Sequence, residues 1–280
     1  MKLIKQSFEI LEQKDFSLVG IKKFIERCGR VCYKSEDRTT DDSYEKFVNM
    51  LEKRDHARPL EFGTVHLQMY ISDFHKLRDT LCINNMWNDQ WIKYHYAGNL
   101  TYVTTNYRYY LAIIKVFPSA ENDFDPQDDE LYPKRYTVHF ITSRGIMDEF
   151  RTHVGLSHLA ESTRYCNYSK GKFGGEVTFV LPNWVPSPIW NENNKAGHIF
   201  LQTMKLLEDI YLDLLSVGET PQQARDILPL SVKSELISCG FEDAWSNFFY
   251  RRCANDAHPM AREIAIPLQE RFKELGYVNQ

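Results

Sequence analysis

Hydrophobic side chains recur at helical spacing in two stretches near the N-terminus, residues 16–34 and 41–54. In both stretches the apolar positions lie three or four residues apart, so they would gather on one face of a helix. The polar residues from Ser35 to Asp42 separate the two stretches and are typical of a turn. The pattern therefore predicts two amphipathic helices joined by a short connection.

After Pro59 the pattern changes to strict alternation. Apolar and polar residues take turns from Thr64 to Ile71, which is the period of a strand with one buried face. Residues 74–88 return to a helical mixture, and residues 101–110 are rich in Tyr, Thr and Val. The first half of the chain therefore combines helices with at least one strand.

An acidic stretch from Pro118 to Pro133 contains few apolar residues. We interpret it as an exposed, solvated insertion rather than a metal site. After it, Tyr136 to Ile141 again has the apolar pattern of a strand.

The second half begins with a predicted helix over residues 146–161, preceded by Gly145. A strand is predicted at Val177 to Leu181, followed by a loop at 182–190, and the C-terminal third is predicted to be helical. In that third, Thr220, Pro221 and Gln223 form the pattern of a capping box at a helix start. Because strands and helices mix without a steady βαβ rhythm or an internal repeat, we expect a single α+β domain over residues 1–280, with a mixed or antiparallel sheet flanked by helices.

Composition and charge exclude several classes of protein. The formal net charge of −4 offers no basic surface for a long nucleic acid, although a mononucleotide needs only a few arginines. No apolar run is long enough to span a membrane, and the charged N-terminus does not resemble a signal peptide. The six cysteines are scattered and lack the paired spacing of a zinc site. We therefore expect a cytoplasmic protein with reduced cysteines and no metal.

The densest polar cluster is the segment RTHVGLSHLAESTRYCNY, from Arg151 to Tyr168. If this segment were helical, His153, Ser157, Glu161 and Arg164 would fall within about 80° of one another. Such a face is suited to bind a polar ligand, but it is also typical of a solvated surface.

Two further clusters carry arginine: Arg225 lies in QQARDILPL, and Arg252 lies in WSNFFYRRC. Arginines beside aromatic residues are often partners in structural ion pairs. Composition and spacing alone therefore lead to an α+β domain with three arginine-bearing polar patches.

Together these segments resemble the flavin-dependent thymidylate synthases. Thr152-His153-Val154, seven further residues, Ser162 and then Thr163-Arg164-Tyr165 follow the spacing of that family's RHR signature. Four other stretches match in the same order: PLEFGTV at 59–65, ARDILPLSV at 224–232, W-x-x-FF-x-x-RC from Trp245, and AHP at 257–259.

The resemblance implies a homotetramer that converts dUMP to dTMP with FAD, NADPH and methylenetetrahydrofolate. Arg252 and Ser162 would be catalytic, and no cysteine would act as a nucleophile. The residues implied to bind the nucleotide are Glu149, Glu161, Ser162, Arg164, Arg225 and Arg252. The residues implied to bind the cofactors are Glu61, Thr64, His153 and Asn247.

The sequence departs from the family pattern on the flavin side. Both arginines of RHR are replaced, by Thr152 and Val154, and Phe62 occupies the place of a histidine. Phe241 and Asp243 occupy the places of an asparagine and an arginine. Two alternatives therefore remain open: a flavin-dependent methylase or hydroxymethylase of another pyrimidine nucleotide, and a nucleotide-binding homologue without catalysis.

Overall fold

The computed structural model describes residues 1–280 except 55, 165, 172–173, 186–192 and 279–280. In the described part, the strands are β1 (Lys2–Ile4), β2 (Ser7–Leu11), β3 (Thr64–Tyr70), β4 (Ile92–Ala97), β5 (Leu100–Asn106), β6 (Phe124–Asp125), β7 (Arg135–Ser143), β8 (Ser157–Ala160), β9 (Thr178–Val180) and β10 (Lys233–Phe241). The α-helices are α1 (Leu18–Tyr33), α2 (Ser43–Lys53), α3 (Ile71–Ile83), α4 (Tyr107–Val116), α5 (Arg144–Phe150), α6 (Lys195–Ser216), α7 (Pro221–Ala224), α8 (Glu242–Arg252) and α9 (Pro259–Glu274).

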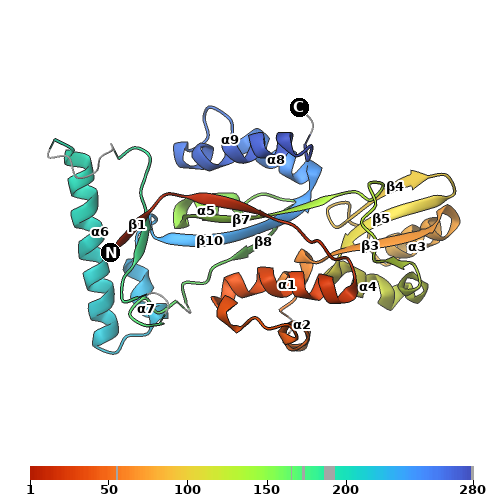
Figure 1. Cartoon of the computed structure of the whole chain (residues 1–280), viewed down its shortest axis with the longest axis horizontal. Helices are drawn as coiled ribbons and strands as arrows, with labels where there is room; N and C mark the ends of the chain where they lie inside the picture. The colour runs from red at the N-terminus through yellow and green to blue at the C-terminus, as the bar shows by residue number, and fades with distance from the viewer. Residues whose placement is uncertain (55, 165, 172–173, 186–192, 279–280) are drawn as a thin grey trace.

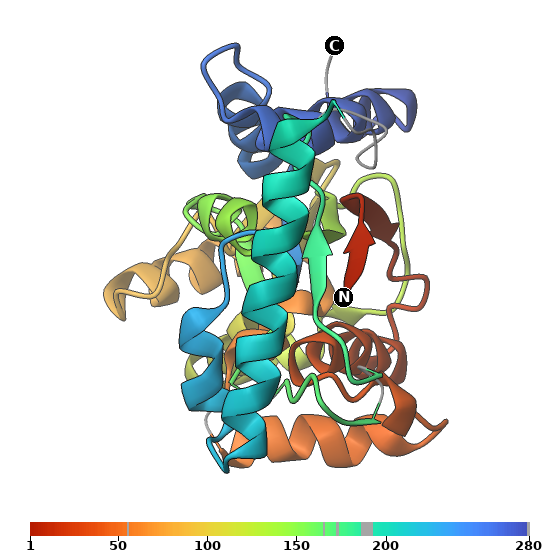
Figure 2. The ribbon, with the colours of Figure 1, turned by 90° about the vertical axis from the view of Figure 1, so that its left-hand side faces the viewer.

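Two four-stranded antiparallel sheets form the centre of the described structure. The first has the order β2-β7-β10-β8 and the second the order β4-β5-β3-β6, while β1 and β9 pair in parallel. Helices α8 and α9 lie on one side of the first sheet and α1 on the other; α3 and α4 accompany the second sheet, and α6 stands at the opposite end of the molecule (Figure 1). Figure 2 shows α6 crossing that end of the first sheet. The predicted α+β class, with antiparallel sheets and flanking helices, is confirmed.

Four long strands pass into a helix without an intervening residue: β3 into α3, β5 into α4, β7 into α5 and β10 into α8. Local capping explains two of these junctions. The hydroxyl of Ser143 accepts from the backbone N–H of Ile146, and the side chain of Asn106 accepts from that of Tyr109. The helices therefore begin at fixed points along the strands, and the side chains around each junction are held by both elements.

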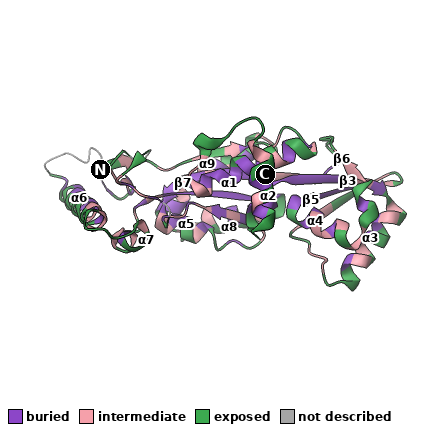
Figure 3. Ribbon diagram, turned by 90° about the horizontal axis from the view of Figure 1, so that it is seen from below, coloured by how far each residue is buried: buried purple, intermediate pink, exposed green. Residues whose placement is uncertain are grey.

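Aromatic packing fixes the helices on the first sheet. Phe140 of β7 packs against Phe150 of α5 and Phe248 of α8, and Trp245 lies fully buried between the sheet and α9. Buried aromatic side chains of this size contribute strongly to the hydrophobic stabilisation of a core. In the burial view the central strands are almost entirely buried, whereas α6 is exposed along much of its length (Figure 3).

Several sequence-based predictions are confirmed by the structure. The two N-terminal helices are α1 and α2, and the alternating stretch after Pro59 is β3. The strand predicted at 136–141 is β7, and that predicted at 177–181 contains β9. The capping box at Thr220 is present at the start of α7. The loop predicted at 182–190 lies partly outside the described residues.

The helix predicted over 146–161 is wrong. Helix α5 ends at Phe150, and Ser157–Ala160 is instead the strand β8, paired with β10. Gly155 explains the break, because its φ of 93° lies in the left-handed region, which does not continue a right-handed helix. The shared helical face of His153, Ser157, Glu161 and Arg164 therefore does not exist.

Two other predictions need correction. The C-terminal third is not purely helical, because it contains β10, the central strand of the first sheet. The acidic stretch at 118–133 is mostly exposed, as predicted, but β6 within it pairs with β3. Tyr132 is also buried there, stacked on His66 with ring centroids 4.0 Å apart.

Candidate functional site

Arg252 lies at the end of α8 and makes hydrogen bonds to three nearby residues. We call this set the Arg252 group; it consists of Arg252, Glu149, Thr152 and His153. Arg252 Nη1 donates to Glu149 Oε2 at 2.8 Å, and its Nη2 donates to the Glu149 carbonyl at 2.7 Å. Its Nε donates to His153 Nε2 at 2.7 Å, and Nη2 also reaches Thr152 Oγ1 at 3.2 Å. These bonds fix the guanidinium plane, so its positive charge is held in one orientation.

The hydrogen bond from Arg252 defines the tautomer of His153. An arginine Nε is always a donor, so His153 Nε2 accepts and a neutral ring carries its proton on Nδ1. Burial and, after it, the charge of Arg252 lower the pKa of His153 to about 4, so the ring is neutral at pH 7. Nδ1 is buried and has no hydrogen-bond partner among the described residues. It is therefore a donor available to an acceptor on a ligand.

A second set of polar side chains, the buried-charge group, consists of Lys34, His139, Glu161, Lys233 and Glu235. Lys233 Nζ contacts Glu161 Oε2 at 3.0 Å and also contacts Glu235. Lys34 Nζ lies 2.5 Å from Glu235 Oε1 and 3.8 Å from Glu161 Oε2, and His139 Nε2 lies 2.9 Å from Glu235 Oε2. The two carboxylates therefore share the two lysine charges.

Burial alone would raise the pKa of Glu235, but the hydrogen bond from His139 and the charges of Lys233 and Lys34 lower it well below its ordinary value. For Lys233, burial acts to lower the pKa, but the charges of Glu161 and Glu235 outweigh it and raise the pKa. Glu235 and Lys233 are therefore ionised at neutral pH, and the ion pair of Lys233 with Glu161 joins the start of β10 to the end of β8.

The segment 162–164 continues from this group toward α7. Thr163 Oγ1 accepts from Arg225 Nη1 at 3.2 Å, and Arg164 Nε donates to Gln222 Oε1 at 3.0 Å. The backbone N–H of Ser162 donates to the carbonyl of Cys32 at 3.4 Å. These contacts link the segment that contains Ser162 and Arg164 to α7 and Arg225 without a shared helix. Tyr165, the last residue of the RHR-like pattern, lies outside the described residues.

Glu61 and Thr64 form a third group with Arg135. The Glu61 carboxylate accepts from Arg108 Nη1 and from Ser157 Oγ, both at 2.6 Å. Arg135 donates through Nη2 to the Glu61 carbonyl at 2.7 Å and through Nη1 to Thr64 Oγ1 at 3.2 Å. Both predicted cofactor residues are buried and already bonded within the chain.

The predicted site residues thus fall into separate groups in the single chain. Among the described residues, no hydrogen bond or ion pair joins the Arg252 group to α7 and Arg225. Asn247 lies exposed on α8, where its Oδ1 accepts from Arg251 Nε at 3.3 Å. The single chain therefore does not bring all of the predicted site residues to one point.

Three charged residues that sequence reasoning missed are central to these groups: Lys233, Glu235 and Arg135. Lys233 and Glu235 lie on β10 and meet their partners through its pairing with β7 and β8. Arg135 lies at the start of β7 and bonds Glu61 and Thr64, which are distant in the chain and outside this sheet. A charge within a strand that is otherwise apolar was the available signal, because an isolated buried charge needs a partner. The identity of the partner was not in the local sequence.

Cys166 and Cys253 have the character of packing residues. Cys166 is buried, and burial followed by the charge of Glu161 raises the pKa of its thiol to about 12. Burial likewise raises the pKa of Cys253 to about 11. At neutral pH neither thiol has appreciable thiolate character, which a nucleophile requires.

Within the described residues, no cluster of His, Cys, Asp or Glu side chains has the arrangement of a metal site. None of the helices there is long and apolar enough to cross a membrane.

Taken together, these groups combine buried carboxylates with several arginines near strand ends. Arginines in such positions are suited to bind a small phosphorylated ligand. The family model of the thymidylate synthase complementing proteins matches residues 134–275, just over half of the chain. The chain therefore belongs to this family.

No curated protein sequence matches the chain significantly. Among solved structures, the crystal structure of a UMP/dUMP methylase from Streptomyces cacaoi bound with 5-Br dUMP is similar at 13% identity. The alignment covers 99% of this chain and 93% of that chain, with a TM-score of 0.45.

Proposed function

We propose that this protein is a flavin-dependent methylase of a uracil nucleotide that converts dUMP to dTMP. The carbon donor would be methylenetetrahydrofolate, the reductant NADPH and the carrier FAD. Family membership supports the reaction class, and the observation that supports the nucleotide site is the contact of segment 162–164 with Arg225 and Gln222. These contacts place two guanidinium groups, which suit phosphate and uracil oxygens, beside Ser162.

The residues around His153 fit a flavin. The buried Nδ1–H of His153 has no partner among the described residues, and a flavin ring offers several acceptors at its edge. We propose that His153 and Asn247 contact the cofactor directly. Glu61 and Thr64, whose polar atoms are already bonded, would act by holding Arg135. When bound, the reduced flavin would supply the hydride and carry the one-carbon unit.

Arg252 would provide electrostatic catalysis. Its fixed charge stabilises negative charge that develops on the uracil ring, and Glu149 and His153 keep the guanidinium aimed. Glu161 would position Ser162, the next residue, by anchoring the chain to Lys233. We propose that the Arg252 group of one subunit and the 162–164 segment of another face the same nucleotide, which explains their separation in one chain.

Binding of nucleotides by the purified protein tests this proposal. Calorimetry with dUMP should show saturable binding, and Arg225→Met should weaken it about 10-fold or more, because a hydrogen bond from a charged donor contributes about 1.5–3 kcal/mol. Arg27→Met on α1 is the matched control, since Arg27 is exposed and pairs with Glu9. No heat from dUMP at millimolar concentration would contradict the nucleotide site.

The same preparation separates the alternatives. Product assays with UMP, dUMP and dCMP identify the preferred pyrimidine. Absorbance near ~450 nm, as flavins show generally, reports bound FAD. A colourless protein that binds dUMP but takes up no added FAD would favour a homologue without catalysis.

The exposed face of α6 supports the proposal of a homotetramer. Ile199, Leu206 and Ile210 are spaced at helical period on one stripe and are 66%, 59% and 38% exposed. Exposed apolar stripes of this kind are typical of subunit interfaces. Leu206→Glu should therefore shift the protein to smaller species in sedimentation velocity. Ile83→Glu, at an even more exposed apolar position on α3, should not change the oligomeric state. Equal behaviour of both variants would contradict an interface on α6.

A further inference from the structure

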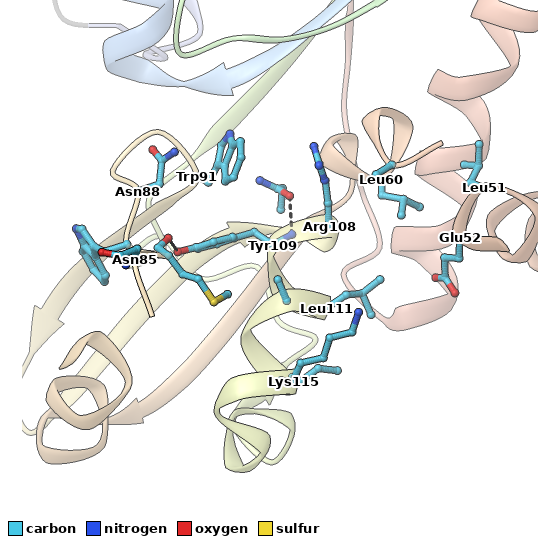
Figure 4. Close-up of a pocket in the computed structure, with 16 residues that line it drawn as sticks. Leu51, Glu52, Leu60, Asn85, Asn88, Trp91, Arg108, Tyr109, Leu111 and Lys115 are labelled. Carbon is cyan, nitrogen blue, oxygen red and sulfur yellow. Dashed lines mark hydrogen bonds between the residues drawn. The ribbon is translucent and has the colours of Figure 1, made fainter. Parts of the chain in front are cut away.

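A cavity of about 660 Å³ lies in the N-terminal half of the chain, away from every group described above except Arg108. It opens between the loop that joins α3 to β4, the start of α4, and α2 with the turn that follows it (Figure 4). Its volume falls in the range of small-molecule sites, about 300–1,000 Å³. All of its lining residues lie between 51 and 115, outside the segment matched by the family model.

The lining combines aromatic surface with fixed cations. Trp91 and Tyr109 line one side, and Arg108 and Lys115 project from α4 (Figure 4). Trp87 also lines the cavity. Trp91 and Tyr109 pack edge to face with ring centroids 5.7 Å apart. The Tyr109 hydroxyl donates to the Met86 carbonyl, which ties α4 to the loop. The aromatic wall is therefore held by the fold before any ligand binds.

The buried carboxylate of Glu61 orients Arg108. Arg108 Nη1 donates to this carboxylate at 2.6 Å, and its guanidinium lies 5.8 Å from the centre of the Trp91 ring. Its side chain is nevertheless 44% exposed, and within the described part of the chain it bonds through Nη1 alone. The remaining N–H groups of the fork are available to an anion that enters the cavity.

We propose that this cavity binds a planar heteroaromatic ligand that carries a carboxylate or phosphate group. The ring would lie against Trp91, whose face is suited to stacking, and the anionic group would bind Arg108 with Lys115 as a second cation. The side-chain amides of Asn88 and Asn106 also line the cavity and offer hydrogen bonds to ring heteroatoms. The proposal does not depend on the nucleotide methylase function, because the two sites share no ligand-binding residue.

Calorimetry on the full chain with two probes tests the proposal. Folic acid presents a pterin with carboxylates, and adenosine 5′-monophosphate presents a purine with a phosphate. At least one probe should bind with a dissociation constant below about 1 mM. Binding of only one probe identifies the ring type, pterin or purine, that the cavity prefers. Binding of both shows that the cavity recognises the features they share, a planar heteroaromatic ring and an anionic group.

Variants assign the binding to this cavity. Arg108→Met and Trp91→Leu should each lower the affinity for the probe at least 10-fold. Arg108→Lys keeps the charge but loses the two-pronged guanidinium, so its affinity should lie between those of wild type and Arg108→Met. Arg108→Met also removes the cation that pairs with the buried Glu61, which can affect folding. Trp91→Leu keeps this ion pair and therefore tests the cavity without that effect. Lys53→Met, exposed at the end of α2 and outside the lining, is the control.

Binding of dUMP separates this proposal from the previous one. Trp91→Leu should leave dUMP affinity unchanged, and Arg225→Met should leave probe affinity unchanged. Failure of both probes to bind at 1 mM, or binding that neither Arg108→Met nor Trp91→Leu weakens, would overturn the cavity site and leave the nucleotide site untouched.

Discussion

Replacing Lys233 with methionine should lower the free energy of unfolding by about 3 to 5 kcal/mol, the usual cost of leaving a buried charge without its partner. Lys233 is 16% exposed, and it contacts Glu161, whose side chain is fully buried, as well as Glu235. In the variant, Lys34 alone would neutralise both carboxylates. Chemical denaturation at pH 7 measures the loss, and Lys5→Met, at an exposed lysine of the N-terminal segment, is the control.

The pH dependence of this effect has a defined sign. The folded-state pKa of Glu235 is lowered from 4.5, so its contribution to stability is present above about pH 4.5 and is lost as the pH falls toward the folded value. Without Lys233 the pKa of Glu235 rises. The difference in free energy of unfolding between wild type and Lys233→Met should therefore become smaller as the pH falls below about 4.5. Replacing both Lys233 and Glu161 with methionine should recover part of the loss, because an apolar pair needs no compensating charge. A variant as stable as wild type at pH 7 would show that Lys34 suffices.

The amphipathic elements of this fold were predictable because their polar and apolar residues recur at a regular period, although Thr64 and His66 on the polar side of β3 are also buried. Helices α1 and α2 and strands β3 and β7 have a polar side and an apolar side, and their periodicity shows in the sequence. Strand β10 does not show it, because all of its residues except Lys233 are buried. Burial on both faces removes the alternation on which strand prediction relies.

The error at residues 146–161 has a different origin. The segment has apolar residues at helical spacing, and its division into α5 and β8 depends on Gly155 and on pairing with β10, nearly 80 residues further along. The glycine was a local signal for a break, whereas the pairing was not visible. Tertiary contacts outweigh local propensity in a segment as short as β8.

The same distinction applies to the site. The arginine-bearing segments were predicted because their residue types are concentrated in the sequence, whereas the contact of Thr163 with Arg225 was not indicated by the sequence. The predicted geometry relied on a helix that does not exist. The actual geometry arises from β8 and β10, which place Glu161 beside Lys233 and so fix the backbone just before Ser162. The buried-charge group therefore fixes the position of residues 162–164, the segment proposed to bind the nucleotide.

Changing Arg252 to lysine should reduce kcat/KM for dUMP by about 10²-fold or more, with a larger effect on kcat than on KM. Lysine keeps the charge, but its single ammonium cannot bond at once to the carboxylate and carbonyl of Glu149 and to His153, as the guanidinium does. Loss of one preorganised donor at a site of developing negative charge costs about 10²–10³ in kcat in other enzymes. Arg271→Lys, exposed on α9, is the matched control and should retain the wild-type rate.

A second readout separates electrostatic catalysis from simple loss of structure. Burial is the largest cause that lowers the pKa of His153 to about 4, and the charge of Arg252 is the next. Arg252→Met should therefore raise this pKa while leaving it below 6.5, which NMR titration of the imidazole measures. The lysine variant keeps a positive charge near the ring, so its His153 should titrate closer to wild type although its rate is low. Wild-type kcat/KM in Arg252→Lys would contradict a role for the guanidinium geometry. An unchanged His153 pKa in Arg252→Met would show that the two side chains are not in contact in solution.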